Sequence, residues 1–199
     1  MKKSIWLFIL GLVGGLVLVF FVVLPKMRPY TFHGTVLQSP QPAPDFELNA
    51  ANGQKVSLKD FEGDLVLLYF GYTFCPDVCP TTLSELSKAL DILGSEAKNV
   101  QVIMISVDPQ RDTPEILAEY VTHFHPSFIG VTGAPEEIAQ VAALYGIFYE
   151  AHEGTAATGY LVDHTATVMV IDQEGHLKLV FPFGTPAEDI AADLAYLLK

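Results

Sequence analysis

The chain has 199 residues, half of them hydrophobic, and a formal net charge of −12 at pH 7. All 23 acidic residues but only 7 of the 11 basic ones lie beyond residue 28, which gives that part of the chain a charge of −16. Nucleic-acid binding and flat adsorption to anionic lipid both require a basic surface, so both are excluded as main functions. The length suits one domain with an appendage.

The N-terminus is the most apolar part of the chain. From Ile5 to Leu24, 20 consecutive residues carry no charge, and as a helix this run would span about 30 Å of hydrocarbon. The alternative, a cleavable signal peptide, would have a shorter apolar core and a small-residue cleavage site. We therefore expect residues 1–28 to be an uncleaved single-pass anchor in the plasma (inner) membrane. The free amino terminus favours the cytoplasm, so the C-terminal domain is expected on the extracytoplasmic (periplasmic) side.

Residues 29–44 contain four prolines and are expected to form a Pro-rich extended linker. In residues 45–199, apolar runs alternate with helical patterns. The expected elements are a hairpin around 50–53, strands at 65–70, 100–107, 128–131, 167–171 and 177–181, and helices at 81–93, 113–123, 135–146 and from 185 onward. Alternation of strands and helices predicts βαβ units and a sheet covered on both faces. The expected fold class is α/β, with a mixed central sheet flanked by helices and an N-terminal β-hairpin.

Cys75 and Cys79 are the only cysteines of the chain. They follow the expected strand 65–70 and precede a helix, at the edge of the sheet where α/β proteins form their sites. A regular helix cannot run through Pro80, so we expect the helix to begin there, with Cys79 near its N-terminus. Because a helix N-terminus stabilises thiolates, both sulfurs are expected to ionise readily, which suits redox attack and metal ligation alike.

A metal would need a further ligand, because two thiolates rarely satisfy an ion alone. Among the six histidines, His164 precedes the expected strand 167–171 and lies in a second loop facing the same crevice. Two thiolates and an imidazole favour Cu(I), and can also hold Cu(II) or zinc. Asp163 could support the imidazole or act as a weak ligand, and Asp77 could tune the loop. From the residues alone, a structural disulfide and two buried apolar cysteines stay open as alternatives.

Three segments carry a resemblance to a known family. They are Gly71–Pro80 (GYTFCPDVCP), Ser106–Pro114 (SVDPQRDTP) and Tyr160–His164 (YLVDH). Together, in this order and spacing, they resemble the Sco/SenC family, the membrane-tethered copper proteins of cytochrome c oxidase assembly, and the resemblance covers roughly residues 40–198. The resemblance implies a thioredoxin-like fold and one copper ion bound by Cys75, Cys79 and His164.

The resemblance also implies partners. It implies delivery of Cu(I) or Cu(II) to, or reduction of cysteines in, the dinuclear copper site of cytochrome c oxidase subunit II. A disulfide between Cys75 and Cys79 could not bind copper, so a thiol reductant is implied, and another copper carrier is a further candidate partner. We expect the soluble domain to be monomeric and to act as a metallochaperone.

The main alternative is an enzyme, a thiol–disulfide oxidoreductase or thiol peroxidase that uses Cys75 and Cys79 as its redox pair. Two features disfavour it. The cysteines have the spacing C-x-x-x-C, whereas thioredoxin-like oxidoreductases have C-x-x-C. These oxidoreductases also resemble one another in carrying a proline just before the strand that corresponds to 167–171, and the segment 165–167 has none. A peroxidase would also need an arginine near its nucleophile, for which Arg111 is the candidate.

Overall fold

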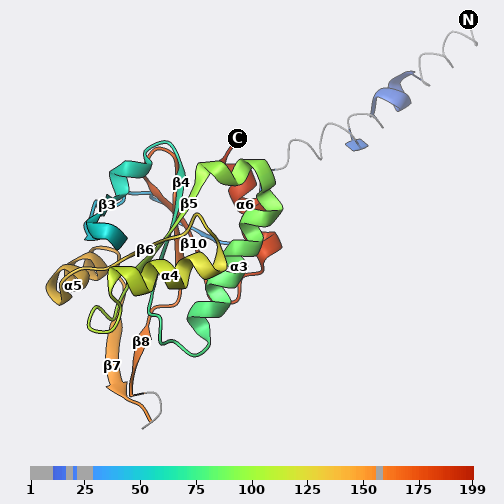
Figure 1. The fold of residues 1–199 in the computed structure, drawn as a ribbon. Helices are drawn as coiled ribbons and strands as arrows, with labels where there is room; N and C mark the ends of the chain where they lie inside the picture. The colour runs from blue at the N-terminus through green and yellow to red at the C-terminus, as the bar shows by residue number, and fades with distance from the viewer. Residues whose placement is uncertain (1–10, 17–19, 22–28, 156–158) are drawn as a thin grey trace, which may run out of the picture. The chain divides into compact units, whose positions relative to one another are not determined.

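The computed structural model describes residues 11–16, 20–21, 29–155 and 159–199, and the chain divides into two compact units, Met1–Phe32 and His33–Lys199 (Figure 1). Most of the expected anchor, residues 1–28, lies outside the described residues. Within the described residues, no helix combines the length and the hydropathy needed to cross a membrane. The single-pass anchor therefore stays a prediction.

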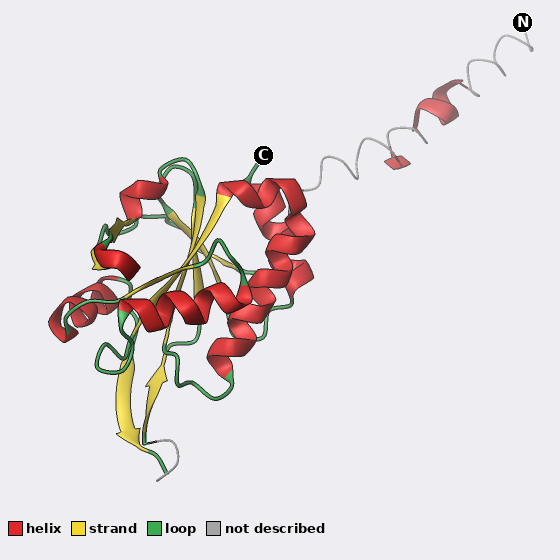
Figure 2. Cartoon of the chain, viewed as in Figure 1, coloured by secondary structure: helices red, strands yellow, loops and turns green. Residues whose placement is uncertain are grey.

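The second unit is built on a mixed sheet of six strands, and strands are drawn in yellow in Figure 2. The strand order is β1-β10-β9-β4-β5-β6. The strands are β1 (Thr35–Val36), β4 (Leu65–Gly71), β5 (Val100–Ser106), β6 (Ile129–Val131), β9 (Val168–Ile171) and β10 (Leu177–Phe181). β4, β5 and β6 are parallel, whereas β9 runs antiparallel to β4 and to β10. The predicted mixed sheet is confirmed, and its two longest apolar runs form the neighbouring strands β4 and β5.

Helices cover this sheet. They are α3 (Val78–Leu93), α4 (Pro114–Phe124), α5 (Pro135–Leu144) and α6 (Ala187–Leu197), with 3₁₀ helices η2 (Ala51–Gly53), η3 (Leu58–Phe61) and η4 (Gly94–Asn99). α3 packs against α6, and α4 packs against β6 (Figure 1). All seven residues of β4 are buried, which requires cover on both faces of the sheet. Thr113 caps α4 by accepting a hydrogen bond from the Ile116 backbone N–H at 3.3 Å, as its position before a proline predicts.

Two small sheets flank the main one. The predicted N-terminal hairpin is confirmed as β2 (Glu47–Asn49) and β3 (Lys55–Ser57). Its turn places Asn52 and Gly53 at φ of 60° and 69°, a conformation that these residue types adopt most readily. The second small sheet pairs β7 (Tyr149–Glu153) with β8 (Tyr160–His164), and we call these two strands the histidine hairpin.

The histidine hairpin differs from the expectation. His164 was expected in a loop, but it is the last residue of β8 and pairs with Tyr149. The hairpin escapes prediction because four of the five β7 residues are exposed, so no apolar run marks the strand. It projects from the main sheet in Figure 2, at the end where the loop between β4 and α3 lies.

The segment 33–44 makes contacts that its composition does not indicate. β1 pairs with β10 at the edge of the main sheet, and Pro42 forms an isolated bridge with His176. A side chain at Gly34 would come within 2.9 Å of Leu179 and Phe181. Glycine at this position therefore lets the chain pass close to the side chains of β10.

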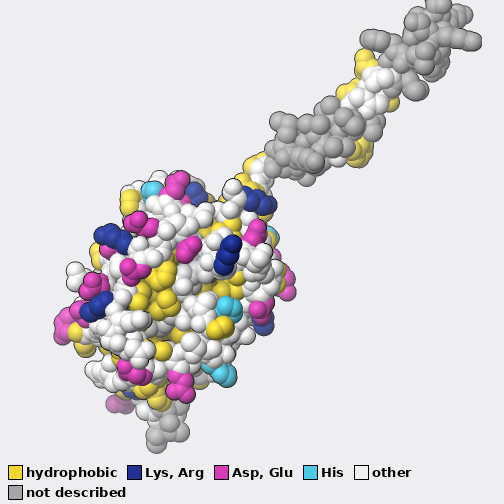
Figure 3. All heavy atoms as spheres, turned by 45° about the horizontal axis from the view of Figure 1, so that its top comes forward, with side chains coloured by type: hydrophobic (Ala, Val, Ile, Leu, Met, Phe, Trp, Pro, Cys, Tyr) yellow, Lys and Arg dark blue, Asp and Glu magenta, His cyan; other side chains and the backbone are white. Residues whose placement is uncertain are grey.

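The surface agrees with the charge of the sequence. On the face shown in Figure 3, acidic side chains are scattered widely, and the Lys and Arg side chains lie apart from one another. This face has no continuous basic patch of the kind that nucleic-acid binding requires.

Candidate metal centre

The two cysteines lie where a buried strand gives way to a helix. β4 ends at Gly71 and α3 begins at Val78, and we call the residues between them, 72–77, the cysteine loop. Cys79 lies in the first turn of α3 and is fully buried, whereas Cys75 is partly exposed. The Cys79 backbone N–H donates to Cys75 Sγ at 3.3 Å, so the helix N-terminus is directed at that sulfur.

The helix begins slightly earlier than expected. Pro80 is the third residue of α3 and not its first. It is tolerated there because the first backbone N–H groups of a helix have no partner within the helix. The consequence is that Cys79 is itself helical and its side chain points into the protein.

The third candidate ligand comes from the histidine hairpin. His164 Nε2 lies 3.4 Å from Cys79 Sγ, and Nδ1 lies 3.3 Å from the backbone carbonyl oxygen of Thr165. The imidazole stands edge-on to the rings of Tyr69 and Tyr72, with centroids 6.1 and 6.0 Å away. A contact from Nδ1 to a carbonyl favours the tautomer with the proton on Nδ1, which leaves Nε2 free to coordinate.

The structure thus brings together Cys75, Cys79 and His164, although 85 residues separate Cys79 from His164. One ligand atom from each lies within 4.8 Å of the others. Two atoms bound to one ion at about 2.0–2.3 Å can be at most about 4.6 Å apart. The cluster is therefore close to the size that a single ion requires.

The two thiols differ in acidity. The Cys79 thiol donates to the Cys75 sulfur, which lowers the pKa of Cys75 to about 3. The same contact with Cys75, together with burial, raises the pKa of Cys79. The prediction that both sulfurs ionise readily therefore does not hold for the pair together, because a second buried thiolate would face the charge of the first.

The sequence suggests roles for two carboxylates at the site: Asp163 as a support or weak ligand for the metal centre, and Asp77 as a residue that tunes the loop. Asp163 is adjacent to His164 in a strand, so the two side chains project to opposite faces. The Asp163 side chain is 79% exposed and its carboxylate lies 3.5 Å from His152 Nδ1. Asp77 Oδ1 accepts a hydrogen bond from the Thr81 hydroxyl at 3.3 Å, within the first turn of α3. The structure thus brings neither carboxylate against the imidazole.

Gly71 is a site residue that sequence reasoning missed. A Cβ atom at this position would lie 3.0 Å from Cys79 Sγ and 2.8 Å from the ring of Tyr69. Glycine therefore lets the strand pass directly beside the buried sulfur. The signal was a glycine at the end of an otherwise apolar strand, which often marks a close approach.

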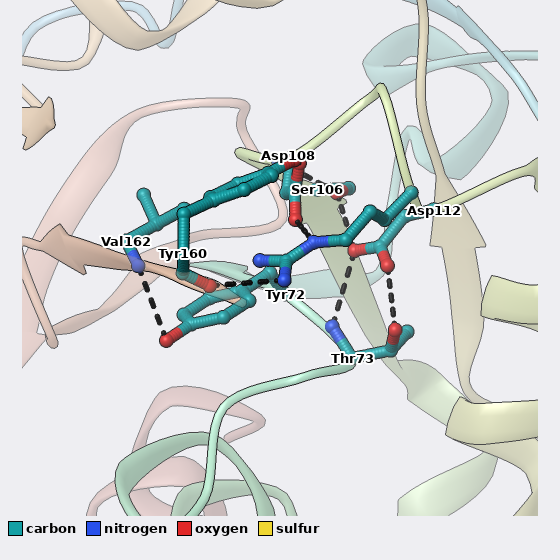
Figure 4. Close-up of polar contacts among 8 residues, drawn as sticks. Tyr72, Thr73, Ser106, Asp108, Asp112, Tyr160 and Val162 are labelled. Carbon is teal, nitrogen blue, oxygen red and sulfur yellow. Dashed lines mark hydrogen bonds and ion pairs between the residues drawn. The ribbon is translucent and has the colours of Figure 1, made fainter. Parts of the chain in front are cut away.

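Asp112 anchors the cysteine loop to the loop that follows β5 (Figure 4). Its buried carboxylate accepts hydrogen bonds from the Thr73 backbone N–H at 3.1 Å and the Thr73 hydroxyl at 2.5 Å. The Ser106 hydroxyl donates to the same carboxylate at 2.6 Å. Burial raises the pKa of Asp112, while the three donors oppose that shift. Ser106 and Asp112, from the segment 106–114, thus hold the segment 71–80 in place.

The comparisons with known proteins agree with this arrangement. A family model described as SCO1/SenC matches residues 35–199. A "SCO2-like protein" of Rickettsia felis is 38% identical over 146 residues, which are 72% of this chain and 71% of that protein.

Two solved structures match the same part of the chain. The apo Sco1 protein of Thermus thermophilus is similar with a TM-score of 0.76 and 44% identity, over 85% of this chain and 98% of that one. Bradyrhizobium japonicum ScoI, solved with copper bound, has a TM-score of 0.72 and 39% identity, over 79% of this chain and all of that one. These likenesses bear out the expected thioredoxin-like fold.

Proposed function

The chain belongs to the SCO1/SenC family, and on this premise we propose that it is a copper-binding protein of cytochrome c oxidase assembly. In this proposal Cys75, Cys79 and His164 bind one copper ion, which the protein passes to a partner. The copper ion is cargo, and the protein is a metallochaperone.

The observation that carries the proposal is the convergence of three soft or borderline ligand atoms on one point. Cys75 comes from the cysteine loop, Cys79 from α3 and His164 from the histidine hairpin, and their ligand atoms lie within 4.8 Å of one another. Thiolates select Cu(I) and zinc over hard cations, and imidazole suits copper and zinc. The copper-bound structure of the Bradyrhizobium japonicum relative favours copper over zinc.

The burial of the ligands supports a route for transfer. Cys79 is fully buried, whereas Cys75 and His164 are partly exposed along one side of an open depression of about 220 Å³. A partner's ligands can reach an ion at Cys75 and His164 before they reach Cys79. We propose that ligands are exchanged one at a time, with the Cys79 thiolate released last.

The partner and the location are further parts of the proposal. We infer cytochrome c oxidase subunit II as recipient, because its dinuclear copper site is the target that the family resemblance implies. Residues 1–28 would anchor the protein in the membrane, with the domain from 45 to 199 on the extracytoplasmic side. A thiol reductant would keep the cysteines from forming a disulfide, in which neither sulfur could bind the ion.

One observation favours a second candidate, a thiol–disulfide oxidoreductase. A partly exposed Cys75 thiolate, whose pKa is lowered to about 3, lies beside a protonated and buried Cys79. This is the arrangement of an attacking and a resolving thiol. The presence of His164 at 3.4 Å from Cys79 Sγ is what favours metal binding instead.

The test is a titration of the full-length chain in mild detergent, reduced under anaerobic conditions, with Cu(I) in competition with a chelator. We expect tight binding of one ion, which Cys75→Ala, Cys79→Ala and His164→Ala each weaken strongly. His176→Ala is the matched control, because His176 lies in a different cluster with Asp172 and Glu174. Weak binding that is indifferent to His164, combined with rapid exchange against a protein disulfide, would favour the oxidoreductase.

A further inference from the structure

Arg111 lies between the two halves of the metal centre. It follows β5, and its side chain is only 18% exposed. Its Cζ atom lies 3.7 Å from the ring centroid of Tyr160 and 4.7 Å from that of Phe74. Phe74 directly precedes Cys75 in the cysteine loop, and Tyr160 is the first residue of β8. The guanidinium group therefore contacts both segments that carry candidate ligands.

Hydrogen bonds fix this guanidinium group in a single orientation. Nε donates to the carboxylate of Asp108, and Nη1 donates to the backbone carbonyl of Tyr160 at 3.0 Å. The Tyr160 hydroxyl donates to the other oxygen of Asp108 at 2.5 Å, so Arg111 and Asp108 hold Tyr160 at its main chain and at its ring (Figure 4). Asp108 is itself buried, and its backbone N–H donates to the Ser106 hydroxyl at 3.0 Å.

These bonds act on the face of β8 that carries the histidine. Tyr160, Val162 and His164 are alternate residues of the strand and therefore project to the same face. The Val162 backbone N–H donates to the Tyr72 hydroxyl at 3.3 Å, which is a second link to the cysteine loop (Figure 4). The hairpin does not pair with the main sheet. Its position relative to the cysteines is set by side-chain contacts of this kind together with the short connection from His164 to β9, which begins at Val168.

We propose that Arg111 is a positioning residue for the metal centre, which fixes the histidine hairpin against the cysteine loop and so sets the place of the His164 imidazole. This inference rests on the proposed copper site. Arginine is suited to the task because its planar group donates in two directions while it stacks on aromatic rings. Lysine has the charge but cannot reproduce the paired bonds to Asp108 and Tyr160.

The inference predicts a defined loss. Residues that orient a metal ligand without binding the metal typically contribute about 10–100-fold to affinity. We expect Arg111→Gln to lower Cu(I) affinity by such a factor, and Arg111→Lys to restore little of it. We also expect a shift in the absorption band that arises from thiolate-to-Cu(II) charge transfer, because the geometry of the ligands changes while their identity does not.

The decisive experiment is a double-mutant cycle on the full-length chain, with Cu(I) affinity measured for wild type, Arg111→Gln, His164→Ala and the double variant. If Arg111 acts through His164, the double variant binds no more weakly than His164→Ala. An equal factor lost in both backgrounds overturns the inference while leaving the copper site intact. Absence of one-to-one, cysteine-dependent binding in wild type overturns the proposed function itself, and this inference with it.

A measurement without copper separates positioning from folding. We expect Arg111→Gln to speed hydrogen exchange at the Val162 amide and to leave the amides of β4 unchanged. Faster exchange at both would indicate a general loss of stability and count against positioning. If Arg111→Gln does not fold, Tyr160→Phe takes its place in the cycle, because it removes only the hydroxyl bond to Asp108 and keeps the ring, and a smaller loss of affinity is then expected.

Discussion

The cysteine loop continues a strand inside the main sheet, whereas the histidine hairpin forms a separate sheet of two strands. The first segment is anchored by the core: all seven residues of β4 are buried, and Cys79 is inaccessible. In the second segment, four of the five residues of β7 are exposed. Two-stranded hairpins are only marginally stable alone, so the hairpin depends on the few groups that contact its inner face.

The difference suits the proposed role, in which the protein carries a metal ion and then releases it. A fixed pair of sulfurs retains the ion, and a ligand on a weakly held segment can withdraw first. Segments with few buried contacts open locally at a lower free energy than the core. We therefore expect changes in the cysteine loop to alter the stability of the domain, and changes in the hairpin to alter mainly the affinity for copper.

The largest expected effect is the loss of Asp112. In Asp112→Ala, the Thr73 backbone N–H, the Thr73 hydroxyl and the Ser106 hydroxyl lose their acceptor inside the protein. Each unsatisfied buried donor costs about 1–3 kcal/mol. The Ser106 hydroxyl is buried and the two Thr73 donors are partly buried, so the free energy of unfolding should fall by about 3 kcal/mol. Urea unfolding measures it. Asp163→Ala in the hairpin is the control, with a change within about 0.5 kcal/mol, since that side chain is 79% exposed. Similar losses of stability in Asp112→Ala and Asp163→Ala would contradict the view that the core anchors the cysteine loop more firmly than the hairpin.

Gly71→Ala tests the close approach to the buried sulfur. The added methyl group would lie 3.0 Å from Cys79 Sγ, and overpacking of this kind typically costs about 1–3 kcal/mol. We expect lower stability and weaker Cu(I) binding, because the sulfur must move. Gly130→Ala is a matched control: its methyl group would lie 2.8 Å from Leu117 Cβ, which is not a site residue. It should lose stability and keep its affinity; equal affinities for both variants would show that Gly71 has no role in the site.

The same contrast explains what the sequence could predict. Apolar runs and capping signals predicted the main sheet and helices such as α4, because burial and local hydrogen bonds leave a pattern in the residues. The histidine hairpin has no such pattern, and the sequence predicts only a loop around His164. The residues alone indicate that His164 faces the same crevice as the cysteines, and the resemblance implies that it is a ligand. The convergence itself, across 85 residues, is a property of tertiary structure. The close approach of Gly71 to Cys79 and the contacts of Arg111 with Phe74 and Tyr160 depend on tertiary distances, which residue spacing does not specify.

Tyr72→Phe tests the second link between the two segments. It removes the oxygen that accepts from the Val162 backbone N–H at 3.3 Å and keeps the buried ring. The loss of one such bond, about 1 kcal/mol, corresponds to about fivefold faster exchange at the Val162 amide. Tyr120→Phe is the control, because among the described residues the buried Tyr120 hydroxyl has no hydrogen-bond partner. If both variants leave the Val162 amide unchanged, the bond does not hold the hairpin.

The smallest expected effect concerns His33, which contacts neither segment of the site. Its Nδ1 lies 3.0 Å from the buried carboxylate of Asp193 and its Nε2 lies 3.4 Å from Asp189. The hydrogen bond to Asp193 is the main cause that raises the pKa of His33 above 6.5. The folded state therefore favours the charged imidazole. The resulting stabilisation is fully present below the unfolded pKa and is lost as the pH rises through the folded one.

His33→Gln should remove this part of the pH dependence, with the difference from wild type largest at about pH 5.5 and absent at about pH 8.5. Urea unfolding at both values measures it, and Cu(I) affinity at a fixed pH should stay that of wild type. Such a variant separates stability from site geometry: it destabilises the domain at low pH without touching the cysteine loop or the histidine hairpin. If the copper affinity of His33→Gln also fell, overall stability would control the site. The proposed difference between the firmly anchored cysteine loop and the weakly held histidine hairpin would then be wrong.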